Sequence, residues 1–280
     1  MKPLTVIGLS LLFLAIESPA QIVDSLDERP LKIHHAEPLY MDLVRDIGAR
    51  KGEREWNLGW GLEKNSRYSA NSGFIEYEFA PLNRLGFEVE VPFTLYRSYL
   101  EEGQRETSAV PHNRIEGVKL ATQYTFLVSD KHQLSMAAGY MHELVTHSFY
   151  TISQRHSLWK GHRMTPFLII ARKWGANIHS MLYTGPEFDL VNHGGPAEMY
   201  YQANLSMHYV LPHSGHFIGL EMNQETAKHF YSLVFRPQVK IKLADGLALG
   251  LVTGLPLHMN SGNSISFLTR LIYEPRHRTH

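Results

Sequence analysis

The sequence predicts an all-β fold, an antiparallel transmembrane β-barrel of about twelve strands with a short N-terminal amphipathic helix. Three observations support this fold class. Stretches of about eight to twelve residues alternate large apolar with small or polar residues, which is the pattern of a strand with one apolar face. They follow a leader that resembles an export signal. The expected strands form an even number joined by alternately short and long connections, as in single-chain bacterial barrels.

Residues 1–20 have the features of a signal peptide. Lys2 supplies a positive charge, residues 4–16 form a short apolar core, and Ser18 to Ala20 end in small residues before Gln21. That core is shorter than a comfortable membrane span, and no later apolar run approaches the roughly 18 residues of a spanning helix. We therefore expect an exported mature chain that begins at Gln21.

Residues 21–54 are predicted to form an N-terminal helical extension. Pro38 suits the first helical turn, and Leu39, Leu43, Val44 and Ile47 would share one face. Two placements are compatible with this pattern. The helix could pack against the periplasmic rim, or it could be a plug inside the barrel.

Residues 55–274 are predicted to form the barrel, and residues 275–280 a C-terminal tail. Leu120, Tyr124 and Phe126 should face lipid, whereas Lys119, Gln123 and Thr125 should face the lumen. Longer polar loops are expected at 100–113 and 149–162. The faces of the strands at 165–172 and 178–184 stay unassigned, because their apolar residues are continuous. The expected strands are 56–62, 75–79, 85–95, 118–128, 134–140, 165–172, 178–184, 201–209, 217–222, 231–242, 247–251 and 267–273.

Composition excludes several classes of function. The chain has 27 Lys and Arg against 27 Asp and Glu, so no basic excess suggests a nucleic-acid partner. The absence of Cys excludes disulfides, thiolate nucleophiles and Cys-based metal sites. A soluble β-sandwich would also alternate, but it would not keep Trp, Tyr, Phe and Leu on its solvated face in strand after strand. The expected partner of that face is outer-membrane lipid, and no cofactor is predicted.

Three motifs resemble one known family. His35-Ala36-Glu37-Pro38-Leu39-Tyr40-Met41-Asp42, with the following residues 43–53, is similar to the opening of the HAEPLYID family of exported Bacteroidota proteins, with Met41 in place of the usual Ile. The segments 76–81 and 88–93 also resemble that family, so the similarity covers most of the mature chain. The resemblance implies the outer membrane of a Gram-negative bacterium. It implies no established activity and no functional residues.

The densest charged feature is acidic. If the second and third strands pair about the turn at 82–83, four glutamates meet on the lumenal face, and like charges that face each other directly are destabilising. They are Glu76, Glu78, Glu88 and Glu90. The candidate counter-charges are Arg45, Arg50, Lys51, Arg54, Lys119, Lys240, Lys242 and Arg270. The cluster is interpreted either as a structural ion-pair network or as a cation-selective wall.

Two further groups were considered as reactive sites. The chain has 17 His, including the pairs His34 with His35, His213 with His216, and His277 with His280, but none has metalloenzyme spacing, so no metal site is predicted. Asn204, Ser206 and His208 alternate on one strand and contain the residue types of outer-membrane phospholipase A. The order of Ser and His is reversed, and the alternation turns both toward the lumen. Polar lining of the lumen is the simpler interpretation.

The sequence therefore favours a non-enzymatic outer-membrane barrel, either a narrow porin or transporter or a structural barrel. A small polar or cationic solute is the expected cargo, and the pattern does not define the oligomeric state. The alternatives are a lipid-modifying hydrolase and a surface-binding barrel that acts through its long loops.

Overall fold

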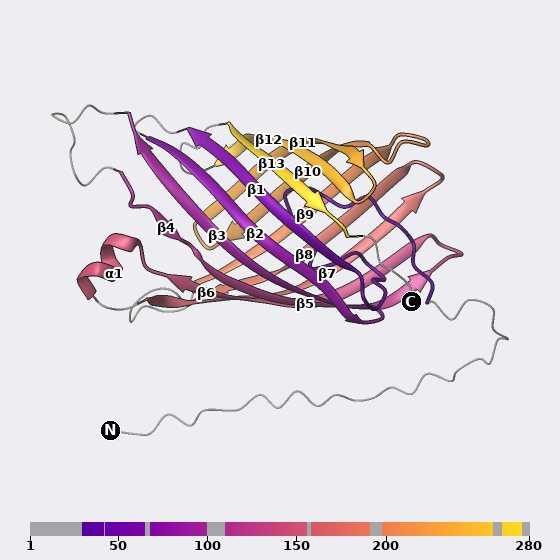
Figure 1. The fold of residues 1–280 in the computed structure, drawn as a ribbon, viewed down its shortest axis with the longest axis horizontal. Helices are drawn as coiled ribbons and strands as arrows, with labels where there is room; N and C mark the ends of the chain where they lie inside the picture. The colour runs from indigo at the N-terminus through magenta and orange to yellow at the C-terminus, as the bar shows by residue number, and fades with distance from the viewer. Residues whose placement is uncertain are drawn as a thin grey trace, which may run out of the picture.

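One antiparallel sheet closes on itself to form a barrel (Figure 1). The computed structural model describes residues 30–41, 43–64, 68–99, 110–155, 158–190, 198–259 and 265–275. The elements in chain order are β1 (Arg54–Lys64), β2 (Tyr68–Leu82), β3 (Leu85–Ser98), β4 (Arg114–Ile115), β5 (Gly117–Ser129), β6 (Leu134–Thr146), α1 (Phe149–Arg155), β7 (Trp159–Trp174), β8 (Ile178–Asp189), β9 (Glu198–Val210), β10 (Phe217–Ala227), β11 (Phe230–Ala244), β12 (Leu247–Met259) and β13 (Ser266–Tyr273).

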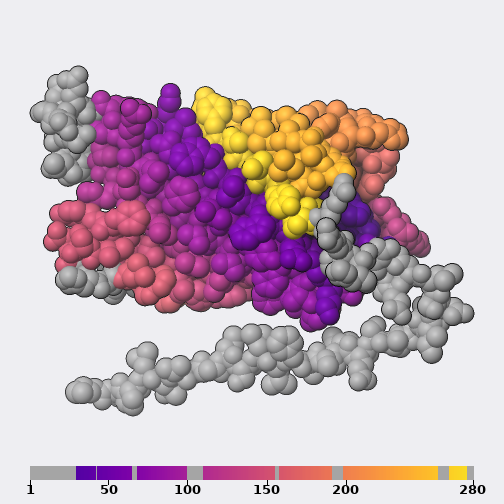
Figure 2. Space-filling model, in the orientation of Figure 1, coloured from indigo at the N-terminus to yellow at the C-terminus, as the bar shows by residue number. Residues whose placement is uncertain are grey.

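The barrel closes between its first and last long strands. β1 pairs with β2 on one side and with β13 on the other, and Figure 2 shows the indigo and yellow strands side by side. The two-residue β4 pairs with β3 just beyond the place where β5 does, so it continues β5 after a break at Glu116. The ring therefore contains twelve strands, and the predicted fold class is confirmed for the barrel.

The two ends of the barrel differ. At one end, here called the turn end, strands are joined by the short connections 83–84, 130–133, 175–177, 211–216 and 245–246. The N-terminal segment and the C-terminal end of β13 lie at this end (Figure 1). The other end, here called the loop end, carries α1 and the longer connections. In bacterial barrels the short turns face the periplasm.

Residues alternate between an outer apolar face and an inner polar face. In β1, Trp56, Leu58 and Trp60 are exposed, whereas Asn57 between them is fully buried inside. In β5, Leu120 and Tyr124 face outward and Gln123 and Thr125 face the lumen, as predicted. The predicted alternation holds through Phe126, which is exposed, and changes only after it. A bulge there leaves both Phe126 and Leu127 exposed on the outer face.

The region predicted as the loop 149–162 is instead partly regular. It contains α1 and the first residues of β7. The Ser148 hydroxyl accepts the backbone N–H of Thr151 at 3.2 Å, which is an N-cap interaction. Most of the other predicted loop, 100–113, lies outside the described residues. Within the described ranges, no helix is long and apolar enough to span a membrane.

The N-terminal segment, defined here as residues 30–41 and 43–53, is not the predicted helix. It consists of bends and turns, with positive φ angles of 82° at Gly48 and 90° at Gly52. Its apolar side chains point to two separate parts of the barrel wall. Leu43, Val44 and Ile47 pack with side chains of β5 to β8, whereas Ala36 and Leu39 pack with side chains of β10 to β13. A single helical face could not serve both walls.

The packing of this segment explains the two strands whose faces the sequence left unassigned. Phe167, Ile169 and Ala171 of β7 are buried on the lumenal side and contact the apolar residues of the segment. Met181 and Tyr183 of β8 belong to the same cluster. This part of the lumen is apolar because it covers Leu43, Val44 and Ile47, so these strands are apolar on both faces.

Candidate functional site in the barrel lumen

Three consecutive backbone N–H groups of the N-terminal segment are held by side chains of the wall. Leu39 N donates to Gln238 Oε1 at 2.7 Å, Met41 N donates to Glu221 Oε1 at 2.9 Å, and Tyr40 N donates to Glu221 Oε2 at 3.3 Å. Glu221 lies on β10 and Gln238 on β11, and both are buried. Buried backbone N–H groups need acceptors, and these three obtain them from side chains of the wall because the segment is neither helix nor strand.

A network of side chains fixes these acceptors. Asn223 Nδ2 donates to Glu221 Oε1 at 2.8 Å, and Gln238 Nε2 donates to Glu221 Oε2 at 3.3 Å. Arg236 Nη1 donates to Asn223 Oδ1 at 2.6 Å, and the Arg236 guanidinium lies 3.4 Å from the centre of the Tyr40 ring. We call Glu221, Asn223, Arg236 and Gln238 the clasp. It binds both the backbone and the aromatic ring at the tip of the segment.

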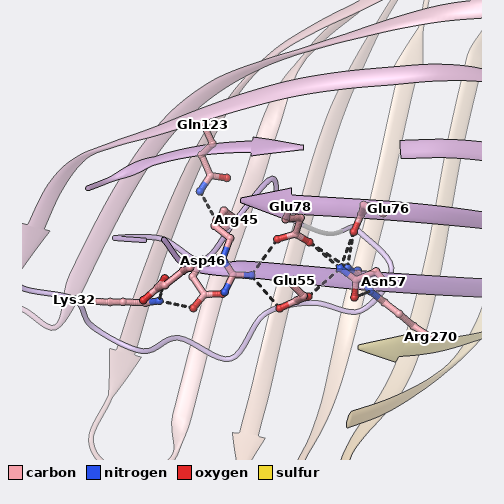
Figure 3. Close-up of polar contacts among 10 residues, drawn as sticks. Lys32, Arg45, Asp46, Glu55, Asn57, Glu76, Glu78, Gln123 and Arg270 are labelled. Carbon is pink, nitrogen blue, oxygen red and sulfur yellow. Dashed lines mark hydrogen bonds and ion pairs between the residues drawn. The ribbon is translucent and has the colours of Figure 1, made fainter. Parts of the chain in front are cut away.

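Arg45 is the second anchor of the segment (Figure 3). Its Nη1 contacts Glu55 Oε2 at 2.9 Å and Glu78 Oε2 at 3.2 Å, and its carbonyl oxygen accepts Gln123 Nε2 at 2.6 Å. Arg45 Nη2 also lies 3.4 Å from Asp46 Oδ1. Arg45, Glu55 and Glu78 are buried, so loss of the arginine would leave two buried carboxylates without their cation.

Arg270 of β13 neutralises the next acid along the wall. Its Nη2 donates to Glu76 Oε1 at 3.0 Å, and its Nε donates to Asn57 Oδ1 at 3.0 Å. Asn57 Nδ2 in turn donates to Glu55, Glu76 and Glu78 at 2.8–2.9 Å, and Figure 3 shows it between them. The alternation in β1 places Glu55 and Asn57 on the lumenal face. Neither residue was predicted from the sequence to belong to the site.

The four predicted glutamates do meet on the β2–β3 hairpin. Glu76 pairs in register with Glu90, and Glu78 pairs with Glu88. All four are buried. Glu90 Oε1 accepts Lys119 Nζ at 2.9 Å. Thus three of the predicted counter-charges, Arg45, Lys119 and Arg270, contact these acids.

The other five predicted counter-charges do not contact the four glutamates. Lys242 pairs with Asp245 at 2.9 Å, in the turn that follows β11. In the described part of the chain, Arg50, Lys51, Arg54 and Lys240 have no ion pair within 4.0 Å of an acid. Lys51 is held only through its backbone N–H, which donates to Asn83 Oδ1 at 2.9 Å.

Lys32 is a buried cation that the sequence analysis missed. Its Nζ lies 2.6 Å from Asp46 Oδ2 and 2.7 Å from Glu53 Oε2, and it ties the start of the segment to its end. Burial acts to lower the pKa of Lys32, but attraction to Asp46 and Glu53 outweighs it and raises the pKa. Burial likewise acts to raise the pKa of Asp46, but Arg45 and Lys32 hold it well below its usual value. Both groups therefore stay charged at neutral pH.

Histidines of the lumen serve as hydrogen-bonding groups. His35 Nε2 lies 2.9 Å from Ser135 Oγ, and His179 Nδ1 accepts the backbone N–H of Ala36 at 2.8 Å. His216 Nδ1 accepts the backbone N–H of Lys242. Among the described residues, no group of three closely spaced metal-ligating side chains contains a histidine. The tail pair at 277 and 280 lies outside the described residues.

Asn204, Ser206 and His208 face the lumen and are buried, as the alternation predicted. Asn204 Oδ1 accepts Asn223 Nδ2 at 2.8 Å, and His208 Nε2 lies 3.1 Å from Gln238 Nε2. The Ser206 hydroxyl and His208 Nδ1 have no hydrogen-bond partner among the described residues. The three side chains therefore line the wall around the clasp and are closed off from the lipid-facing surface.

Cavities lie on both sides of the segment tip. On the loop-end side, one of about 340 Å³ is lined by Tyr40, Glu63, Glu225 and Arg236, and one of about 470 Å³ by residues that include Met41. On the turn-end side, a cavity of about 650 Å³ is lined by residues of the segment and by β8, β11 and the C-terminal residues. The segment thus lies across the lumen between them.

A family model matches residues 31–274, which is most of the chain. The chain belongs to the HAEPLYID-like family. The match includes both the N-terminal segment and all the strands of the barrel. No curated protein matches the sequence.

Solved structures similar to this family member are outer-membrane porins and channels. The COG4313 outer membrane channel from Pseudomonas putida F1 has a TM-score of 0.61 at 12% identity, covering 82% of this chain and 98% of that one. NanC porin has a TM-score of 0.57 at 7% identity over 79% and 100% of the two chains. KdgM porin, solved with disordered oligogalacturonate, has a TM-score of 0.53 at 14% identity over 79% and 99%. At these identities the similarity concerns the fold.

Proposed function

We propose that this protein is an outer-membrane channel for small polar solutes in a Gram-negative bacterium, and that its N-terminal segment obstructs the lumen. The observation that carries the proposal is the attachment of Leu39, Tyr40 and Met41 to Glu221 and Gln238. It fixes the segment tip across the barrel between cavities that open on its two sides. A purely structural barrel would not need a lumen divided in this way.

The side chains that line the larger loop-end cavity favour a polar solute that is either zwitterionic or uncharged. Its wall bears three cations and three acids, and two of the cations contact these acids. Arg163 contacts Glu143 at 2.8 Å and Glu187 at 3.2 Å, and Arg114 contacts Glu116 at 2.6 Å. Such a wall offers donors and acceptors without a strong net field, so it favours neither anions nor cations.

The outer surface supports a location in the outer membrane. The exposed Trp, Tyr, Leu and Ile side chains of successive strands form an apolar face that would contact outer-membrane lipid. In that orientation the turn end faces the periplasm, and the segment enters the lumen from that side. Solute would enter through the loop-end cavities and stop at Tyr40 and Met41 until the tip moved.

Flux through reconstituted protein tests this function. The full chain and Glu221→Ala are refolded into liposomes, and swelling is followed with glycine, glucose and a trisaccharide. We expect slow swelling for the native chain and at least threefold faster swelling for Glu221→Ala, because the variant no longer holds the N–H groups of Tyr40 and Met41. The matched control is Glu225→Ala, which removes a lumenal acid from the same face of β10 without touching those N–H groups.

Two results would contradict the proposal. If neither the native chain nor Glu221→Ala admits glycine, the barrel is structural. If Glu221→Ala and Glu225→Ala accelerate swelling equally, the segment tip is not the obstruction.

A further inference from the structure

We propose that Glu76, Glu88 and Glu90 bind one divalent cation, of the size and hardness of Ca²⁺, on the lumenal face of the β2–β3 hairpin. This site is independent of whether the barrel conducts solute. The site consists of carboxylates whose negative charge is only partly neutralised by the ion pairs of the wall.

The geometry of the three carboxylates suits such an ion. One oxygen from each lies within 4.8 Å of one oxygen from each of the others. Two ligands on opposite sides of a Ca²⁺ ion, each at its usual distance of about 2.3–2.6 Å, are separated by roughly 4.6–5.2 Å. Mg²⁺ demands shorter distances of about 2.0–2.1 Å and near-ideal octahedral geometry, which three side chains fixed on a sheet supply less readily.

Oxygen atoms remain available on two of the three residues. Both nitrogen donors to Glu76, from Asn57 and Arg270, bind its Oε1. The Lys119 contact of Glu90 also uses Oε1. The Oε2 atom of each residue therefore accepts no hydrogen bond from a nitrogen donor in the described part of the chain.

Glu88 supplies a second, independent indication. Its side chain is only 5% exposed, and one of its carboxylate oxygens lies within 4.8 Å of those of Glu76 and Glu90. No hydrogen bond or ion pair within 4.0 Å joins it to a described residue, and Lys119, which bonds Glu90, attracts it only from a longer distance. An isolated buried carboxylate is costly, and burial without a partner is rarely tolerated in native structures. The cation offers the partner that the protein side chains do not.

The charge balance of this wall agrees with a divalent ion. Five buried carboxylates lie on the lumenal faces of β1 to β3, namely Glu55, Glu76, Glu78, Glu88 and Glu90. Three cations contact them, namely Arg45, Lys119 and Arg270. Arg45 is also shared with Asp46, so the acids on these faces outnumber the cations that contact them, and a divalent cation would reduce this excess of negative charge.

The competing account is that protons, rather than a metal ion, neutralise Glu88 and its neighbours. Glu88→Gln distinguishes the two accounts, because the amide has the same shape without the charge. Without an ion, removal of an unpaired buried carboxylate should stabilise the barrel. With an ion bound, the same substitution removes a ligand.

The experiment uses the full chain refolded in detergent at neutral pH. Calorimetric titration of CaCl₂ into chelator-treated protein should show one site per chain, and Glu88→Gln and Glu90→Gln should each weaken binding at least tenfold. In EDTA, Glu88→Gln should melt above the native chain, and in excess CaCl₂ the order should reverse. MgCl₂ should bind more weakly than CaCl₂. Glu116→Gln, a lumenal acid outside the cluster, should bind CaCl₂ as the native chain does.

The proposal is overturned if the native chain binds no CaCl₂ at a one-to-one ratio. It is also overturned if Glu88→Gln and Glu90→Gln bind as tightly as Glu116→Gln. A melting temperature that rises equally in EDTA and in CaCl₂ for Glu88→Gln would show that protons neutralise the cluster. Should Glu88→Gln fail to refold, the calorimetric titration of Glu90→Gln against Glu116→Gln still decides the proposal.

Discussion

Gly86 of β3 lies directly against Arg45 of the N-terminal segment. A β-carbon added to Gly86 would come within 2.6 Å of the Arg45 β-carbon and 3.6 Å of its α-carbon. The absence of a side chain at Gly86 thus lets the segment backbone approach the wall closely enough for Arg45 to reach Glu55 and Glu78. The close approach and the ion pairs depend on each other.

Gly86→Val should loosen the segment without preventing barrel closure. The added methyl groups would meet the first atoms of the Arg45 side chain, which cannot rotate away, and overpacking of this kind costs about 1–3 kcal/mol. We expect faster proteolysis within residues 43–53, measured on refolded protein. Gly250→Ala is the comparison, because its new β-carbon would meet the terminal methyl groups of Leu39, which can move. Equal proteolysis of the two variants would show that the contact at Gly86 does not position the segment.

Gln238→Ala should expose the backbone N–H of Leu39. That group would lose its acceptor inside the barrel, at a cost of about 1–3 kcal/mol for an unsatisfied buried donor. Hydrogen exchange of the Leu39 amide should accelerate at least tenfold, and Glu221 would also lose one of its donors. Gln202→Ala removes a lumenal amide that bonds Glu187 instead, and it should leave exchange at Leu39 unchanged. Unaltered exchange in Gln238→Ala would contradict the role of the clasp.

The barrel was predictable because every strand has one face in contact with lipid, and the side chains on that face must be apolar. Trp56, Leu58 and Trp60 must face outward, and period-two alternation reveals this without any knowledge of contacts between strands. The counter-charges were only partly predictable. Arg270 lies far from Glu76 in sequence, and closure of the sheet between β1 and β13 brings them together.

The form of the N-terminal segment was not predictable from its spacing. Leu39, Leu43 and Ile47 recur every four residues, which favours a helix in isolation. In the barrel, Leu39 and Leu43 enter different apolar clusters, and wall side chains satisfy the backbone N–H groups. Local periodicity cannot anticipate acceptors such as Glu221 that lie about 180 residues away. The continuous apolar run of β7 was the one available signal that the lumen held an apolar occupant.

Acidification should weaken docking of the segment through His35. Burial, and then repulsion from His179, His34 and Lys173, lowers the pKa of His35 to about 4. Because the undocked histidine would titrate near 6.5, the undocked state binds more protons between pH 6.5 and 4. Docking stability contributed by neutral His35 is therefore complete above pH 6.5 and declines as pH falls toward 4.

The comparison variant for this effect is His35→Gln, whose amide can still bond Ser135. Hydrogen exchange of the segment should depend less on pH in the variant. The number of protons taken up when the segment undocks should be smaller by about one over that interval. Because other groups also titrate, including Asp46, only the difference between native chain and variant is informative. Identical pH profiles would exclude His35 as a sensor.

Leu120→Arg should destabilise the barrel in a membrane. Leu120 is 46% exposed on the outer face of β5, between Lys119 and Ala121, which turn inward. A cation on the lipid face costs about 2–4 kcal/mol near the bilayer midplane. Urea unfolding in phospholipid vesicles measures the loss. If the same substitution costs nothing in vesicles, the outer face of β5 is not in contact with lipid.

Ser206→Ala should preserve both the barrel and whatever activity it has. The Ser206 hydroxyl is buried without a hydrogen-bond partner, so its removal should leave the unfolding free energy unchanged or raise it by up to about 1 kcal/mol. Asn204→Ala on the same strand should instead destabilise the barrel, because Asn223 would lose the acceptor for one of its N–H groups.

Purified protein should also release no fatty acid from phospholipid vesicles, with or without calcium, because Ser206 and His208 face the lumen. Hydrolysis that Ser206→Ala abolishes would show that lipid reaches the lumen and would establish the barrel as a hydrolase.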